Sequence, residues 1–79
     1  MKGFRHGGYD VFPTGQQLLN EDGSLGKWMA LASVVRWRGD QVLAMPVSWY
    51  PPAFETEQTA AAYAATAAKK MIDEGRCKI

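Results

Sequence analysis

Two apolar stretches near the middle of the chain predict a β-hairpin. Residues 26–38 are rich in Trp, Val, Met and Leu, which is typical of a strand, and residues 41–50 form the return strand. Gly39–Asp40 between them suits a two-residue type II′ turn, because that turn takes glycine at its first central position. Pro51–Pro52 is expected to end the second strand, since proline cannot donate a hydrogen bond to a sheet.

A bent strand, or two short strands, is predicted before this hairpin. Residues 9–19 carry apolar side chains on both sides of the bend at Pro13–Thr14–Gly15, and Asn20–Ser24 is a cluster of turn-forming residues. Residues 1–7 show no comparable pattern and are expected to be frayed, as are residues 76–79.

The last part of the chain has the composition of one amphipathic helix, from about Glu57 to Glu74. Thr56 suits the N-cap position because its hydroxyl can accept a hydrogen bond from a free backbone N–H. Gly75 suits the position after the helix end. Small side chains dominate the apolar stripe, so we expect the helix axis to lie close to the sheet; the stripe consists of Ala60, Tyr63, Ala64, Ala67, Ala68, Met71 and Ile72.

Strands followed by a helix predict a single α+β domain over residues 1–79. We expect a three-stranded antiparallel meander sheet with one C-terminal helix packed on one face, in the order β-β-β-α. A chain of 79 residues buries only about 62% of its unfolded surface. Such a small core is marginal without a disulfide, a metal or a partner chain.

The few cysteine and histidine residues restrict how the domain is stabilised. With only Cys77 and His6, the sequence excludes an intrachain disulfide and an ordinary metal site, and it indicates no cofactor. A partner chain is therefore the expected source of added stability. The N-terminus has no secretory signal and the apolar run at residues 28–35 is too short to cross a bilayer, so we expect a cytoplasmic protein without membrane contact.

Both sides of the predicted hairpin are apolar. With a two-residue turn, Arg38 faces Gln41, and residues that face each other share one side of the sheet. One side then carries Trp28, Ala30, Ala32, Val34, Leu43, Met45, Val47 and Trp49, and the other carries Met29, Leu31, Val35, Trp37, Val42, Ala44 and Tyr50 with Ser33, Pro46 and Ser48. A turn of odd length would change this grouping.

One helix can cover one side of this sheet only, and an exposed apolar side usually marks an interaction surface. The leading hypothesis is a non-enzymatic domain that self-associates as a homodimer, or binds another protein, through an apolar sheet face. Pro46 is expected to make its strand an edge strand, which blunts that edge against further pairing. The interface candidates, for the case in which the helix covers the opposite side, are Trp28, Val34, Leu43, Met45, Val47 and Trp49.

Candidate catalytic groups are sparse, and we expect no enzyme activity. His6 has no nucleophile or orienting carboxylate at a local spacing, and Cys77 lies near the end of the chain. The acidic residues beside the helix lie at its opposite ends, too far apart to act as a carboxylate pair. A small apolar ligand between sheet and helix is a further hypothesis, which needs a cavity of about 300 Å³ or more.

Nucleic-acid binding is the alternative hypothesis. Basic residues neighbour aromatic ones at Lys27–Trp28 and at Arg36–Trp37–Arg38, where cations could contact phosphates and tryptophan could stack on bases. A net charge of +1 excludes the simplest case, a strongly basic chain. The candidate contact residues are Lys27, Arg36 and Arg38.

The segment Phe54–Ala60, which reads Phe-Glu-Thr-Glu-Gln-Thr-Ala and follows the predicted strands, resembles a known family. It is similar to the arm-type DNA-binding domain at the N-terminus of phage tyrosine-recombinase integrases, over about residues 28–72. In that family a Phe and a Thr lead into an Ala-bearing helix, and the sheet reads a DNA groove. The resemblance implies DNA contacts by Lys27, Arg36 and Arg38, although the predicted sheet here is apolar where the family's sheet is polar and basic.

Overall fold

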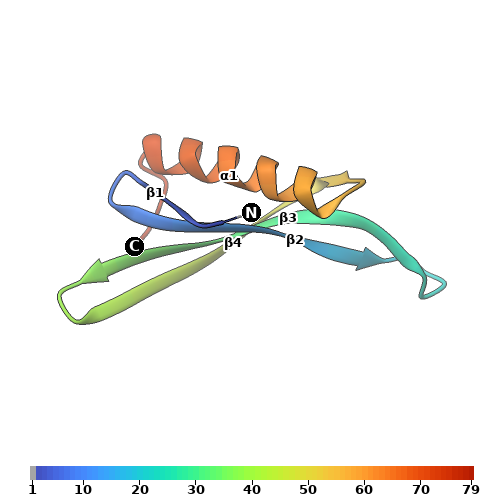
Figure 1. Cartoon of the computed structure of the whole chain (residues 1–79), viewed down its shortest axis with the longest axis horizontal. Coiled ribbons are helices and arrows are strands. Elements are labelled where there is room, and N and C mark those ends of the chain that lie inside the picture. Colours follow the sequence, from blue (N-terminus) through green and yellow to red (C-terminus); the bar gives the residue numbers. More distant parts are fainter. Residues whose placement is uncertain (1) are drawn as a thin grey trace.

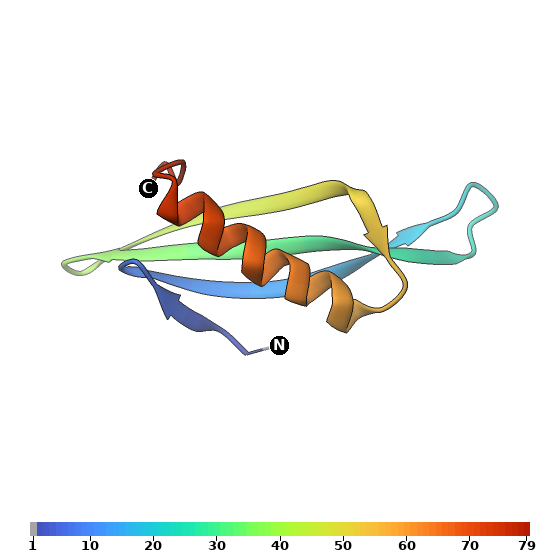
Figure 2. The same ribbon diagram turned by 90° about the horizontal axis from the view of Figure 1, so that it is seen from above.

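Four strands precede one helix in the computed structural model, which describes residues 2–79 (Figure 1). The strands form one antiparallel sheet in the order β1-β2-β3-β4, and the helix lies across one side of it (Figures 1 and 2). This confirms the α+β class and the C-terminal helix, whereas the expectation of three strands is wrong. The elements are β1 (Phe4–His6), β2 (Tyr9–Leu19), β3 (Leu25–Arg38), β4 (Gln41–Phe54) and α1 (Glu57–Asp73).

The additional strand lies in the segment that the sequence pattern assigned to a frayed terminus. β1 pairs with the start of β2, from Phe4 opposite Val11 to His6 opposite Tyr9. Gly7 and Gly8 join the two strands with φ angles of 57° and 84°, and a type I′ hairpin turn needs positive φ at both central residues. The Gly-Gly pair was therefore the available sequence signal for this hairpin.

The register of the second hairpin is confirmed over most of its length. β3 and β4 pair continuously from Arg38 opposite Gln41 to Ala30 opposite Trp49. Gly39 has a φ of 61°, whereas Asp40, like the other described residues that are not glycine, has no positive φ. This combination fits the predicted type II′ turn, which has positive φ at its first central residue.

The end of β4 differs from the expectation. The pairing shifts beyond Ala30, so that Met29 lies opposite Ala53, and Pro51–Pro52 falls inside the shift. These prolines therefore do not end the strand, because an unpaired segment needs no donor N–H. β4 continues to Phe54.

The turn between β2 and β3 is held by its own polar groups. The N–H of Gly23 donates to the carbonyl oxygen of Asn20 over 3.0 Å. The hydroxyl and backbone N–H of Ser24 both donate to the carboxylate of Asp22, and these hydrogen bonds lower the pKa of Asp22 below its ordinary value. The predicted turn at residues 20–24 is thus confirmed.

Small side chains bring α1 close to the sheet. Thr56 begins the helix as predicted, and its Oγ1 accepts a hydrogen bond from the N–H of Thr59 over 3.1 Å. A Cβ atom placed on Gly15 of β2 would lie 3.2 Å from both the Cα of Glu57 and the Cβ of Ala60. The buried core is correspondingly made of small residues, namely Val11, Ala30, Ala32, Ala64 and Ala68.

The sheet is much longer than the helix that covers it. The 14 residues of β3 extend about 48 Å, whereas the 17 residues of α1 extend about 26 Å. The molecule measures 47 × 22 × 21 Å, and the turns between β2 and β3 and between β3 and β4 project beyond the two ends of the helix (Figure 2). The helix therefore cannot shield the whole length of even the side on which it packs.

The close contact at Gly15 predicts a loss of stability when that residue is enlarged. In Gly15→Val the added methyl groups push against helix backbone, so we expect the free energy of unfolding to fall by about 1–3 kcal/mol. Urea denaturation measures this change. Thr14→Val, next along β2 but exposed, is the control and should change the unfolding free energy by no more than about 0.5 kcal/mol. Equal effects of the two variants would contradict the close contact.

Candidate interaction face

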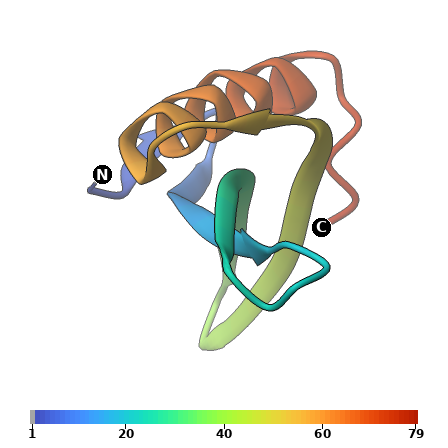
Figure 3. The same cartoon turned by 90° about the vertical axis from the view of Figure 1, so that its right-hand side faces the viewer.

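Burial alternates along the strands and separates two sides of the sheet. Val11 and Pro13 of β2 and Ala30, Ala32 and Val34 of β3 are buried on the side that carries α1. The side chains between them point to the other side, which no helix of the described chain covers (Figures 1 and 3). We call this other side the open face; it consists of Arg5, Asp10, Phe12, Thr14, Gln16, Met29, Leu31, Ser33, Val35, Trp37, Val42, Ala44, Pro46, Ser48 and Tyr50.

Only two of the 15 residues that define the open face are charged: Arg5 and Asp10 lie opposite each other on β1 and β2, at the margin of the face. Nine of the others are apolar or aromatic, and the remaining four are Thr, Gln or Ser. Several large side chains on this face are well exposed: Phe12 is 50% exposed, Trp37 58%, Val42 50% and Tyr50 60%. A solvated face of an antiparallel sheet normally carries polar and charged residues, so this composition is unusual for a surface that only meets water.

The six interface candidates named from the sequence lie on the covered side. Val34 is completely buried there, and Trp49 packs against the core. Leu43, Met45 and Val47 are half-buried at alternate positions of β4, and Trp28 is half-buried opposite Phe54. The sequence grouped these residues on one side, and the structure places the other group on the open face.

A size difference between the two sides could have identified the covered one. Gly15, Ala30 and Ala32 lie where the alanine-lined helix approaches, whereas Phe12 and Leu31 stand at the neighbouring positions on the open face. A helix lined with alanine packs closely only against small residues. Small residues at alternate positions were thus the missed signal for the helix-binding side.

β4 forms one edge of the sheet, as the sequence predicts. Pro46 lies opposite Ser33, in a position that alternates with the hydrogen-bonded pair at Arg38–Gln41, so its nitrogen points away from β3. Proline on this outer side offers no N–H to a further strand. The face, and not this edge, is the accessible surface for association on this side of the molecule.

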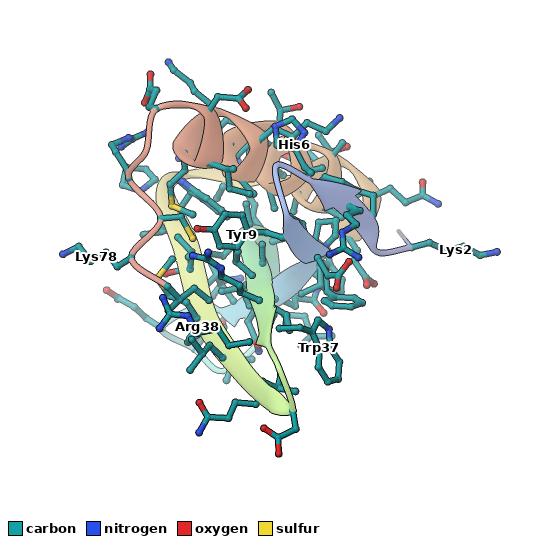
Figure 4. The ribbon with its side chains drawn as sticks, turned by 90° about the vertical axis from the view of Figure 1, so that its left-hand side faces the viewer. Lys2, His6, Tyr9, Trp37, Arg38 and Lys78 are labelled. Atoms are coloured by element: carbon teal, nitrogen blue, oxygen red, sulfur yellow. The ribbon has the colours of Figure 1, made fainter. Side chains whose placement is uncertain are left out.

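The three nucleic-acid candidates do not form one basic patch. Lys27 lies near the start of β3 and pairs with Glu55 at 3.2 Å, whereas Arg36 and Arg38 lie about 30 Å away at its other end. Arg38 is exposed and projects to the opposite side of β3 from Trp37 (Figure 4). By the alternation along β3, Arg36 and Arg38 lie on the covered side, whereas Lys27 lies two positions before Met29, just beyond the end of the open face.

Arg36 instead holds the end of the chain. Its Nη1 donates to the backbone oxygen of Ile79 over 3.1 Å, and the hydroxyl of Tyr9 donates to the same oxygen over 2.6 Å. The guanidinium also lies over the Tyr9 ring, 5.5 Å from its centroid. Cys77 and Ile79 are half-buried while Arg76 and Lys78 are exposed, so the segment assigned to a frayed tail has a defined inner side on the covered half of the sheet (Figure 4).

His6 has a partner that local spacing could not reveal. Its Nε2 lies 2.8 Å from Oδ1 of Asp73, 67 positions away in the sequence. The ammonium of Lys69 lies over the nearby Phe4 ring, with Nζ 4.9 Å from the ring centroid. These two contacts fix β1 against the end of α1. They give His6 a structural tether between a strand and a helix.

Groups that could perform chemistry are not gathered elsewhere on the surface. Within residues 2–79, no three His, Cys, Asp or Glu side chains are close enough to hold a metal ion. The same part of the chain contains no pocket that could receive a small ligand. No helix of the described residues is long and apolar enough to cross a membrane.

Comparison with protein-family models, with curated proteins and with solved structures finds no match to this chain. The interpretation of the open face therefore depends on its own chemistry and geometry.

The hydrogen bonds that Arg36 and Tyr9 donate to Ile79 predict that the C-terminal segment becomes more mobile when either residue is altered. Arg36→Gln or Tyr9→Phe removes a hydrogen bond worth about 1 kcal/mol, so we expect the Cys77 thiol to react about fivefold faster with a thiol reagent. Arg38→Gln is the control, because Arg38 is exposed and the contact with Ile79 is made by Arg36, two positions earlier. Equal rates in all three variants and the parent chain would contradict a held tail.

Proposed function

We propose that this chain is a non-enzymatic association module that binds a protein surface, including that of another copy of itself, through its open face. The observation that carries the proposal is a largely apolar face, charged only at Arg5 and Asp10 on its margin, that exposes aromatic residues across three neighbouring strands. Interface centres are depleted in charge and enriched in Trp, Tyr, Phe and Met, and the open face has all four of these residue types.

The exposed apolar area is large enough to drive association. Four side chains at 50–60% exposure, three of them aromatic, leave on the order of 400 Å² in water. Burial of that area contributes roughly 10 kcal/mol, which is similar to the 4–15 kcal/mol that association costs in lost freedom. The aromatic residues alone therefore do not make a tight complex, and the smaller residues between them must also be buried.

The chain's charges support a protein partner more than a nucleic acid. Nucleic-acid affinity comes largely from cations that contact phosphates. Here the open face has one cation, Arg5, opposite Asp10 at its margin, and Lys27 and Arg36 already have partners within the chain. DNA binding by these residues stays a prediction with less support from the arrangement of charge.

A matched pair of variants tests the proposal. Ala44 on the open face and Ala62 on the outer side of α1 are both exposed alanines, so Ala44→Arg and Ala62→Arg make the same change at two places. We expect the parent chain and Ala62→Arg to be recovered in complexes after cross-linking in native lysate, whether with themselves or with another protein. Ala44→Arg should be recovered free, because it places an unpaired charge in the contact.

The proposal fails if the parent chain is recovered free under the same conditions. It also fails if Ala44→Arg and Ala62→Arg give the same complexes. Circular dichroism and the urea midpoint of each variant establish that all three chains are folded.

A further inference from the structure

We infer that the occupant of the open face is a second copy of this chain, packed face to face about a two-fold axis. This inference rests on the association module proposed above and names its partner. Its basis is the area of the face, the position of its two charged residues at the margin, and the way its large and small side chains are distributed.

The area of the face agrees with that of a weak homodimer. Three strands about 4.8 Å apart and residues 29–37 of β3 at about 3.4 Å each define a surface of about 14 × 30 Å. Two such surfaces bury about 850 Å² in flat projection. This flat area lies at the low end of the range for protein–protein contacts, where weak and transient interfaces are found. We therefore expect a dissociation constant in the micromolar range.

The charge distribution places no obstacle to pairing of identical faces. In a two-fold interface the same patch meets itself, so any charge near the axis would meet its own copy. The two charged residues of the open face, Arg5 and Asp10, have opposite signs and lie at its margin, away from the row of Phe12, Ser33 and Pro46. Two copies related by an axis through that row therefore bring no like charges together.

The side chains of the face complement one another when the second copy is reversed. The pairing aligns Phe12, Ser33 and Pro46 in a central row across the three strands. An axis that crosses the strands at this row lays Trp37 of each copy over Met29 of the partner subunit. Thioether sulfur packs favourably against aromatic rings.

The same axis brings smaller residues together between these anchors. Val35 of one copy then faces Leu31 of the partner subunit, while Phe12, Ser33 and Pro46 lie on the axis and each meets its own copy. An axis along β3 would instead place every side chain of that strand against its own copy, including the two large Trp37 side chains. The crossing axis is therefore the better match.

Sedimentation velocity between about 1 and 500 μM tests the identity of the partner. The parent chain and Ala62→Arg should pass from monomer to dimer over this range, as is typical of micromolar association. Ala44→Arg should raise the dissociation constant at least about 30-fold, which is the effect of a disrupted interface centre.

The failures of this inference and of the proposed function are distinguishable. A parent chain that stays monomeric at 500 μM overturns the second copy as partner. If that monomer still captures another protein that Ala44→Arg does not capture, the association module stands. A dimer that Ala44→Arg leaves unchanged overturns both, because the contact then lies elsewhere on the chain.

The position of the axis has its own test. In a Cys77→Ser background, Ser33→Cys places the only thiol at the proposed axis, where two copies should be joined by a short bismaleimide. Ser24→Cys, in the exposed turn between β2 and β3, is the control and should remain unjoined. Dimers by sedimentation that are not joined through Ser33→Cys would overturn the proposed axis.

Discussion

The close approach of an alanine-lined helix to small residues of the sheet determines the rest of this structure. Gly15 lies directly under the first turn of α1, and Ala30 and Ala32 lie in the same buried layer. Only this side of β2 and β3 accepts the helix at such a short distance, because Phe12 and Leu31 on the other side are too large. The large residues of the covered side, such as Met45 and Trp49, lie on β4, and the open face is left uncovered as a consequence of this packing.

The difference in length between helix and strands is the second constraint. A helix of 17 residues covers about half the length of a 14-residue strand. The C-terminal tail, which Arg36 and Tyr9 hold through the backbone oxygen of Ile79, adds cover at one end of the same side. With both the helix and the tail on the covered side, the described chain leaves the open face without cover of its own.

Local signals predicted the helix, its Thr56 cap and the register beside Gly39–Asp40, because each depends on residues close in sequence. β1 was not predicted because its three residues are too few to show an alternation of apolar and polar positions, although Gly7–Gly8 indicated its turn. The contact between His6 and Asp73 joins residues 67 positions apart, and no spacing rule reaches that far. The choice between two apolar sides depended on side-chain volume, since hydrophobicity alone did not separate them.

Hydroxyl-radical footprinting of the folded chain at low and at high concentration tests the central claim most directly. Trp37 on the open face and Tyr63 on the helix are both exposed, at 58% and 39%. Modification of Trp37 should fall as concentration rises, because a second copy covers it, while modification of Tyr63 should stay constant. If modification of Trp37 does not change up to the highest concentration, the open face is not covered by a second copy and the account is contradicted.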